Sequence, residues 1–231
     1  MKTPLVLIPG LLCDAALWAH QSQTLADIAD VQIGDTMSAE SMAGMAEAVL
    51  AAAPERFALA GLSMGGYVSL EVMRQAPGRV IKLALLDTAA VADDAEKRKN
   101  RLELIKLAET GKFKGVTPRL LPLFLHPDRL ADERLTGAVM EMAGRVGKDA
   151  FLRQQRAILG RIDSRPRLAA IHVPTLVLCG RQDGLTPLAR HEEMAAAIPG
   201  ARLSVIEDCG HLSTMERPAA ATAMMRDWLI R

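Results

Sequence analysis

The stretch FALAGLSMGG, residues 57–66, decides the fold class. Its first four residues form an apolar run without alternation, which is typical of a buried parallel strand. Residues 61–65 then read Gly-Leu-Ser-Met-Gly, and residues 64–75 have helical spacing. A strand that turns sharply into a helix can present a serine hydroxyl above a sheet, and glycines beside the serine leave room for that turn. The stretch therefore predicts a strand, a tight turn at Ser63 and a helix.

Short apolar runs of the same kind recur along the chain, and helical stretches such as 43–53 and 221–229 lie between or after them. Alternation of strand and helix predicts a parallel sheet with helices on both faces, which is an α/β fold. We expect six strands, all parallel, at residues 5–8, 31–33, 57–60, 81–86, 175–178 and 203–206.

The alternation breaks between residues 93 and 167, where no convincing strand occurs and helical spacing with several prolines replaces it. A helical insertion between two strands of a parallel sheet is typical of a cap over a binding site. We therefore predict a core domain of residues 1–92 and 168–231 and a helical cap of residues 93–167.

Composition excludes several functional classes. The formal net charge is +1, which gives no reason to expect nucleic-acid or membrane-surface partners. The three cysteines are widely spaced and form no CxxC pair, so neither a disulfide framework nor a metal site is indicated. No apolar stretch is long enough for a signal peptide or a membrane span, and we expect a cytoplasmic protein. The oligomeric state is open.

His211 is the best candidate for a base that activates Ser63. It follows Gly210 just beyond the apolar run 203–206, so it lies at the carboxyl end of the sheet, where doubly wound proteins build their sites. The next residues, 213–216, match a capping box that would begin a helical turn. The other four histidines lie on expected helices, in the cap or before a strand.

Two aspartates compete to orient that histidine. Asp183 comes shortly after the strand at 175–178, and Asp87 directly follows the strand at 81–86. An acid in this place holds the imidazole in the tautomer that can accept the serine proton. We favour Asp183 because it lies in a loop past its strand, where a carboxylate can come alongside the histidine loop, and the order Ser63, Asp183, His211 agrees with the order that this kind of strand-turn-helix site uses. Asp87 stays the alternative.

Acyl transfer also needs donors for the developing oxyanion, and two backbone amides are candidates. One is the N–H of Met64, directly after Ser63. The other belongs to the loop after the first strand, where Gly10 permits close backbone approach; we assign it to Leu11, with Leu12 as the alternative. Cys13 and Trp18 are candidates to line the pocket, although simple packing would also explain both.

The expected cap is basic. Residues 93–167 hold 17 Lys and Arg against 11 Asp and Glu, and eleven of the cations are arginines. Arginine can grip a carboxylate through two parallel hydrogen bonds. Among them we single out Arg153, Arg156 and Arg161 as candidate substrate-binding residues and hypothesise that at least one binds a carboxylate of the substrate. The alternative is that these charges are solvated surface.

These motifs together resemble the α/β-hydrolase superfamily over the whole chain, and the second half resembles the 3-oxoadipate enol-lactonase branch and related small esterases. The resemblance implies a Ser63–Asp183–His211 triad, no cofactor, a helical cap and a small-molecule ester or lactone as substrate. It is carried by residues 9–12, 61–66, 174–183, 186–187, 198–202 and 210–213.

The sequence departs from that family in two places. Pro9-Gly10 stands where most relatives have His-Gly, which should leave the amide donor intact. The chain also begins at what is usually the third strand, which predicts a reduced sheet without the antiparallel edge hairpin. Two other functions stay open: a carbon-carbon bond hydrolase acting on ring-cleavage products, and a non-catalytic ligand receptor.

Overall fold

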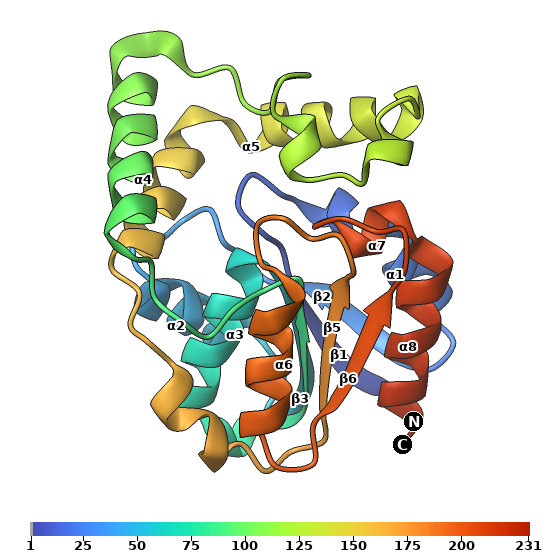
Figure 1. The fold of residues 1–231 in the computed structure, drawn as a ribbon. Coiled ribbons are helices and arrows are strands. Elements are labelled where there is room, and N and C mark those ends of the chain that lie inside the picture. The colour runs from blue at the N-terminus through green and yellow to red at the C-terminus, as the bar shows by residue number, and fades with distance from the viewer. Residues whose placement is uncertain (1) are drawn as a thin grey trace.

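The computed structural model describes residues 2–231, and its centre is one parallel sheet (Figure 1). The strand order is β2-β1-β3-β4-β5-β6, and every neighbouring pair is parallel. The predicted six-stranded parallel sheet is confirmed. The strands are β1 (Thr3–Ile8), β2 (Ala29–Ile33), β3 (Phe57–Leu62), β4 (Val80–Leu86), β5 (Thr175–Gly180) and β6 (Arg202–Ile206).

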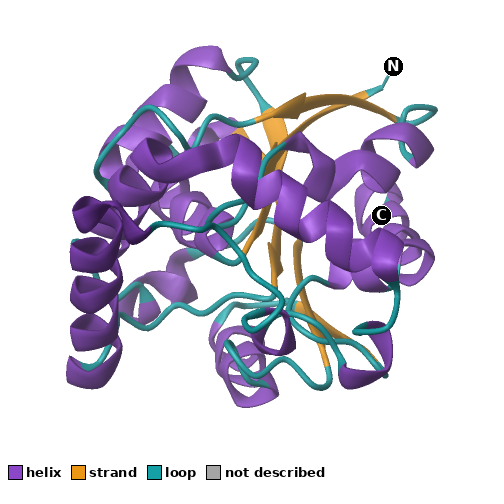
Figure 2. Cartoon of the chain, turned by 90° about the horizontal axis from the view of Figure 1, so that it is seen from above, coloured by secondary structure: helices purple, strands orange, loops and turns teal. Residues whose placement is uncertain are grey.

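Helices cover both faces of the sheet, as the view from above shows (Figure 2). On β1, Leu5 and Leu7 pack into one apolar cluster and Val6 and Ile8 into another, so neither face meets water. One face is covered by α1 (Ala19–Thr24) and α8 (Pro218–Ile230); the other is covered by α2 (Met42–Ala52), α3 (Met64–Gln75) and α6 (Leu188–Ala197).

The segment between β4 and β5 contains helices and turns, and the structure assigns no strand to it. Its two long helices are α4 (Ala95–Leu107) and α5 (Glu133–Leu159), and α5 is interrupted at Gly147, where φ is 75° and ψ is 179°. Both helices lie beyond the carboxyl ends of the strands (Figure 1). Short turns connect them: η3 (Ala108–Lys112), η4 (Leu121–Leu123) and η5 (Pro127–Arg129).

We propose that residues 93–167 form a cap over a core of residues 1–92 and 168–231. The boundary at 167 cuts through η6 (Arg165–Ala170), which packs against α6 of the core. The remaining short elements are η1 (Ala15–Trp18), η2 (Pro77–Arg79) and α7 (Ser213–Glu216). Within residues 2–231, no helix is both long enough and apolar enough to cross a membrane.

Candidate active site

Ser63 lies at the turn from β3 into α3 and has the strained backbone that this turn demands. Its φ is 56° and its ψ is −116°, which a residue with a side chain rarely adopts. The two flanking glycines are required by space: a Cβ on Gly61 would lie 2.2 Å from the carbonyl oxygen of Gly65, and a Cβ on Gly65 would lie 2.1 Å from that of Ile8. The sharp turn predicted from the sequence is therefore present.

His211 meets Ser63 from the loop between β6 and α7. Its Nε2 lies 2.8 Å from Ser63 Oγ, and the histidine is 3% exposed. The backbone N–H of His211 donates to the carbonyl of Phe124, in the segment between β4 and β5, at 2.8 Å. The histidine loop is thus held from above by residues that the sequence places in the cap.

Asp183 is the carboxylate beside the other ring nitrogen. Its Oδ2 accepts from Nδ1 of His211 at 2.8 Å and from the hydroxyl of Thr186 at 2.6 Å, while Oδ1 accepts from the amides of Leu185 and Thr186. Burial raises the pKa of Asp183, but His211 and these hydrogen bonds outweigh burial and hold it below its usual value. Burial lowers the pKa of His211, and the Asp183 charge reverses the shift to a net rise.

Asp87, the alternative acid, has a different set of partners. Its Oδ1 accepts from the amide of Gly180 at 3.0 Å, and its Oδ2 accepts from both the amide and the hydroxyl of Ser213. Burial, and then repulsion by Asp183, raises the pKa of Asp87 to about 8. Asp87 thus ties the start of α7 to the end of β5, and Asp183 is the carboxylate that contacts His211.

The helical turn expected at residues 213–216 is present, but the capping box is not formed. Glu216 accepts from the amide of Leu212, whereas a capping box over these residues would place it on the amide of Ser213, which donates to Asp87. The Ser213 hydroxyl donates to Asp87 instead of accepting from the helix, and the helical turn begins at Ser213 itself. A buried carboxyl oxygen needs a hydrogen-bond partner, and the Ser213 hydroxyl supplies one to Asp87.

The two backbone amides predicted as oxyanion donors belong to Leu11 and Met64, which both border the cavity that contains Ser63. Within residues 2–231, the amides of Leu11 and Met64 donate to no protein acceptor. A Cβ on Gly10 would lie 3.3 Å from Ser63 Cβ, so the loop after β1 approaches the serine closely. The alternative donor, Leu12, is already engaged, because its amide donates to Gln154 Oε1 at 3.0 Å.

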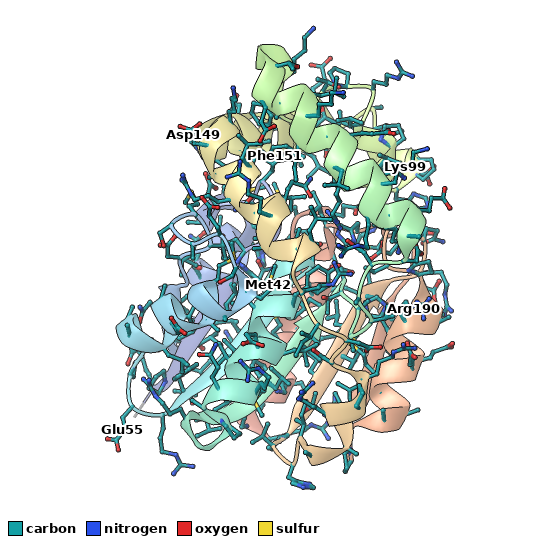
Figure 3. All side chains as sticks on the ribbon, turned by 90° about the vertical axis from the view of Figure 1, so that its left-hand side faces the viewer. Met42, Glu55, Lys99, Asp149, Phe151 and Arg190 are labelled. Atoms are coloured by element: carbon teal, nitrogen blue, oxygen red, sulfur yellow. The ribbon has the colours of Figure 1, made fainter. Side chains whose placement is uncertain are left out.

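A cavity of about 470 Å³ opens over Ser63 and His211. Its walls are mostly apolar and include Leu12, Phe113 and Val139. Phe151 of α5 and Arg190 of α6 also border it; both residues are labelled in Figure 3. Cys13 lines the cavity, but Trp18 does not: it is fully buried in the core beneath the loop, so its assignment to substrate binding is wrong.

The three candidate arginines do not lie together in the structure. Arg161 borders the cavity, where its guanidinium lies 4.1 Å from the Tyr67 ring centroid and 2.9 Å from a carboxylate oxygen of Asp93. Arg153 donates to the carbonyl of Met37, and Arg156 pairs with two glutamates; both lie outside the cavity lining. The long helix α5 directs these two side chains away from the cavity, which sequence order alone did not reveal.

Sequence reasoning missed the cationic face of α4. Lys97, Arg101, Leu104 and Leu107 all border the cavity. Their spacing of four, three and three residues places them on one side of a helix, so the signal was present in the sequence. Gln154 was also missed, because a glutamine inside a helical pattern carries no sign of a distant partner.

The arrangement can pass a proton from Ser63 to His211, whose other ring nitrogen contacts Asp183. Free amides beside the serine can donate to an anionic oxygen that forms there. Within residues 2–231, no group of three or more His, Cys, Asp or Glu side chains is placed to hold a metal ion.

Comparison with known proteins fits this geometry. The family model of the alpha/beta hydrolase fold matches residues 3–218. The chain belongs to the α/β-hydrolase family. Its sequence is similar to that of a candidate carbamate hydrolase, RutD, from Azorhizobium caulinodans, with 29% identity over 96% of this chain and 89% of the relative.

Two solved α/β structures resemble this one closely. An esterase from Thermogutta terrifontis, solved with malate bound, has a TM-score of 0.89 and 28% identity over 99% of this chain and 90% of its own. An enol-lactonase from Burkholderia xenovorans has a TM-score of 0.89 and 25% identity over 100% of this chain and 92% of its own. These likenesses support a hydrolase of the esterase and lactonase branch.

Proposed function

We propose that this α/β-hydrolase cleaves a carboxylic ester or lactone of a small molecule, with Ser63 as nucleophile, His211 as general base and Asp183 as the acid that orients it. One observation carries the proposal: the His211 ring contacts both partners, with Nε2 2.8 Å from Ser63 Oγ and Nδ1 2.8 Å from Asp183 Oδ2.

In the first half of the reaction, Ser63 Oγ attacks the acyl carbon and its proton passes to Nε2 of His211. The carbonyl oxygen becomes an anion that accepts from the amides of Leu11 and Met64. Collapse of this intermediate breaks the bond to the leaving oxygen, which takes the proton from His211. A water molecule, deprotonated by the same histidine, then attacks the acyl-enzyme and releases the acid and Ser63. Every proton is carried by His211, so the cycle needs no cofactor.

The substrate bond is inferred from the relatives and the cavity together. The similar proteins are named for a carbamate, an ester and a lactone, and all three bonds join an acyl carbon to a leaving heteroatom. A mostly apolar cavity of about 470 Å³ is of a size for a small molecule.

We further propose that the substrate carries a carboxylate. Among the side chains that the structure describes, the charged residues that border the cavity, apart from the histidine, are five cations and one anion, namely Lys97, Arg101, Lys114, Arg161 and Arg190 against Asp93. A cleft lined by one sign of charge concentrates ligands of the opposite sign. The similar esterase solved with malate bound is compatible with such a preference.

The function is tested with purified protein and a panel of short esters, lactones and vinylogous diketones of the ring-cleavage type. We expect turnover of esters or lactones by the wild type and none by Ser63→Ala. Turnover of the diketones alone would favour carbon-carbon bond cleavage. Saturable binding of panel members without turnover would favour a receptor.

The carboxylate preference is tested by comparing matched esters with and without a distal carboxylate. We expect kcat/KM about 10-fold higher for the carboxylate ester, a gap that Arg101→Gln narrows and high salt reduces. Arg134→Gln is the matched control, because this exposed arginine of the cap segment lies outside the cavity lining. Equal kcat/KM for the two esters at low salt would contradict the preference.

A further inference from the structure

Leu12 has a backbone conformation that a leucine avoids. Its φ is 58°, in the left-handed region where glycine is favoured. The amide of Cys13 donates to the carbonyl of Gly10 at 3.1 Å, which closes a turn with Leu11 and Leu12 at its centre. A positive φ at the second central residue alone is typical of a type II turn, which normally has glycine or asparagine there.

A type I turn would suit this sequence better, because it needs no positive φ. The two types differ by a rotation of roughly 180° of the peptide between the central residues. In the observed form, the Leu12 N–H points to α5, where Gln154 Oε1 accepts it at 3.0 Å. In a type I turn that N–H would turn away from Gln154.

Gln154 is placed to act as a fixed acceptor. It is fully buried, and its Nε2 donates to the carbonyl of Thr36 at 3.1 Å in the loop after β2. With the amide nitrogen committed to that carbonyl, only Oε1 can face Leu12. The helix α5, which carries Gln154, lies over the loop that follows β1 (Figure 1).

We propose that Gln154 is a positioning residue: by accepting from Leu12 N–H, it anchors the loop whose preceding amide, that of Leu11, donates to the substrate carbonyl. This inference rests on the proposed function, because it assigns a cause to the geometry of the oxyanion site. It also connects the segment between β4 and β5 to the chemistry, since the acceptor comes from α5 and the donor loop from the sheet.

The test is the variant Gln154→Met, which keeps side-chain length and removes the acceptor, assayed on any ester that the wild type turns over. We expect kcat to fall by about 10- to 100-fold, less than complete loss of an oxyanion donor, with KM changed by no more than about 3-fold. A boronic-acid inhibitor forms a tetrahedral adduct with the serine, and its affinity should fall in parallel with kcat. Asp149→Asn, on the exposed side of the same helix (Figure 3), is the matched control and should keep wild-type kcat.

A rescue separates positioning from general damage. Glycine adopts a positive φ without strain, so Leu12→Gly should hold the turn without help from Gln154. In the Leu12→Gly background, Gln154→Met should therefore lower kcat by less than about 3-fold, a value well below its effect in the wild type. If Gln154→Met does not fold, Gln154→Leu, which also lacks the acceptor, is assayed in both backgrounds with the same expected results.

Three results would overturn the proposal: an unchanged kcat in Gln154→Met, a rise in KM with kcat intact, or an equal loss in the Leu12→Gly background. Failure of the proposed function is recognised separately, because the wild type would then hydrolyse no ester or lactone and the variants would not be needed.

Discussion

Strained residues gather around the cavity. Four residues other than glycine have a positive φ within residues 2–231, and three of them, Leu12, Ser63 and Asp87, lie in the loops that build the site. Such conformations cost about 1–3 kcal/mol each and persist only where surrounding contacts enforce them. Each of these residues has such contacts: Gln154 for Leu12, the flanking glycines for Ser63, and Gly180 with Ser213 for Asp87.

The two buried aspartates should differ sharply when each is changed to asparagine. Asp183→Asn should lower kcat by about 10⁴-fold, because His211 loses control of its tautomer. Asp87→Asn should keep kcat within about 10-fold, because Asp87 contacts Ser213 and Gly180 and not the histidine ring. Steady-state kinetics of both variants decide the matter, and the reverse ranking would mean that Asp87 is the acid.

Asp87 should also leave a signature in the pH dependence of stability. Its pKa is about 8 in the folded protein and about 4 in an unfolded chain, so the folded state binds more protons between these values. The contribution of this group to the free energy of unfolding is therefore highest below about pH 4 and falls as the pH rises towards 8. Asp87→Asn should flatten that fall, as measured by urea unfolding across this range. An equally steep fall in the variant would show that the carboxyl is ionised in the folded protein.

At the scale of elements, the sequence predicted what local chemistry controls. The strand at β3, the turn at Ser63 and the helix α3 follow from buried apolar residues, glycines and helical spacing, and all three are present. The position of Arg153 and Arg156 outside the cavity and the partner of Gln154 were not predictable, because they depend on how α5 is rotated over the sheet. The rotation is set after the break at Gly147, a feature that spacing alone does not reveal.

Two glycines of α5 offer a matched test of that break. A Cβ at either Gly144 or Gly147 would meet no atom within 4 Å beyond the adjacent residues and the nearby backbone of its own helix, so the pair differs in backbone conformation and not in space. Gly144→Ala should raise the free energy of unfolding by about 0.5–1 kcal/mol, because alanine favours the helix. Gly147→Ala should lower it by about 1–3 kcal/mol, because φ and ψ of 75° and 179° suit glycine alone. Urea unfolding measures both; equal shifts would mean that α5 is not broken at Gly147.

At the scale of the whole molecule, the core is closed to solvent and holds all three thiols. Cys13, Cys179 and Cys209 are free and buried. Burial raises the pKa of Cys13 and of Cys179 to about 12, and it raises the pKa of Cys209 as well. Thiolate is the reactive form, so none of these groups should react in the native protein. Free thiols suit a reducing compartment, and the cytoplasmic location stays a prediction.

This closure is tested with a chromogenic thiol reagent at mildly alkaline pH. The native protein should release no colour over minutes, whereas protein unfolded in guanidinium should show three thiols, the number in the sequence. A ligand that fills the cavity should make no difference to the native result. Rapid reaction of one thiol in the native protein would show that Cys13, which borders the cavity, is accessible.

Covalent labelling tests the role of Ser63 most directly. A fluorophosphonate phosphonylates serines that a histidine activates, with loss of fluoride. The reagent is incubated with wild type, Ser63→Ala and His211→Ala, and the masses of the intact and digested proteins are measured by mass spectrometry. We predict one adduct per wild-type chain, located on the peptide that contains Ser63, and none on either variant. An adduct on Ser63→Ala, or a wild-type adduct on any other residue, would contradict the assignment of Ser63 as the nucleophile.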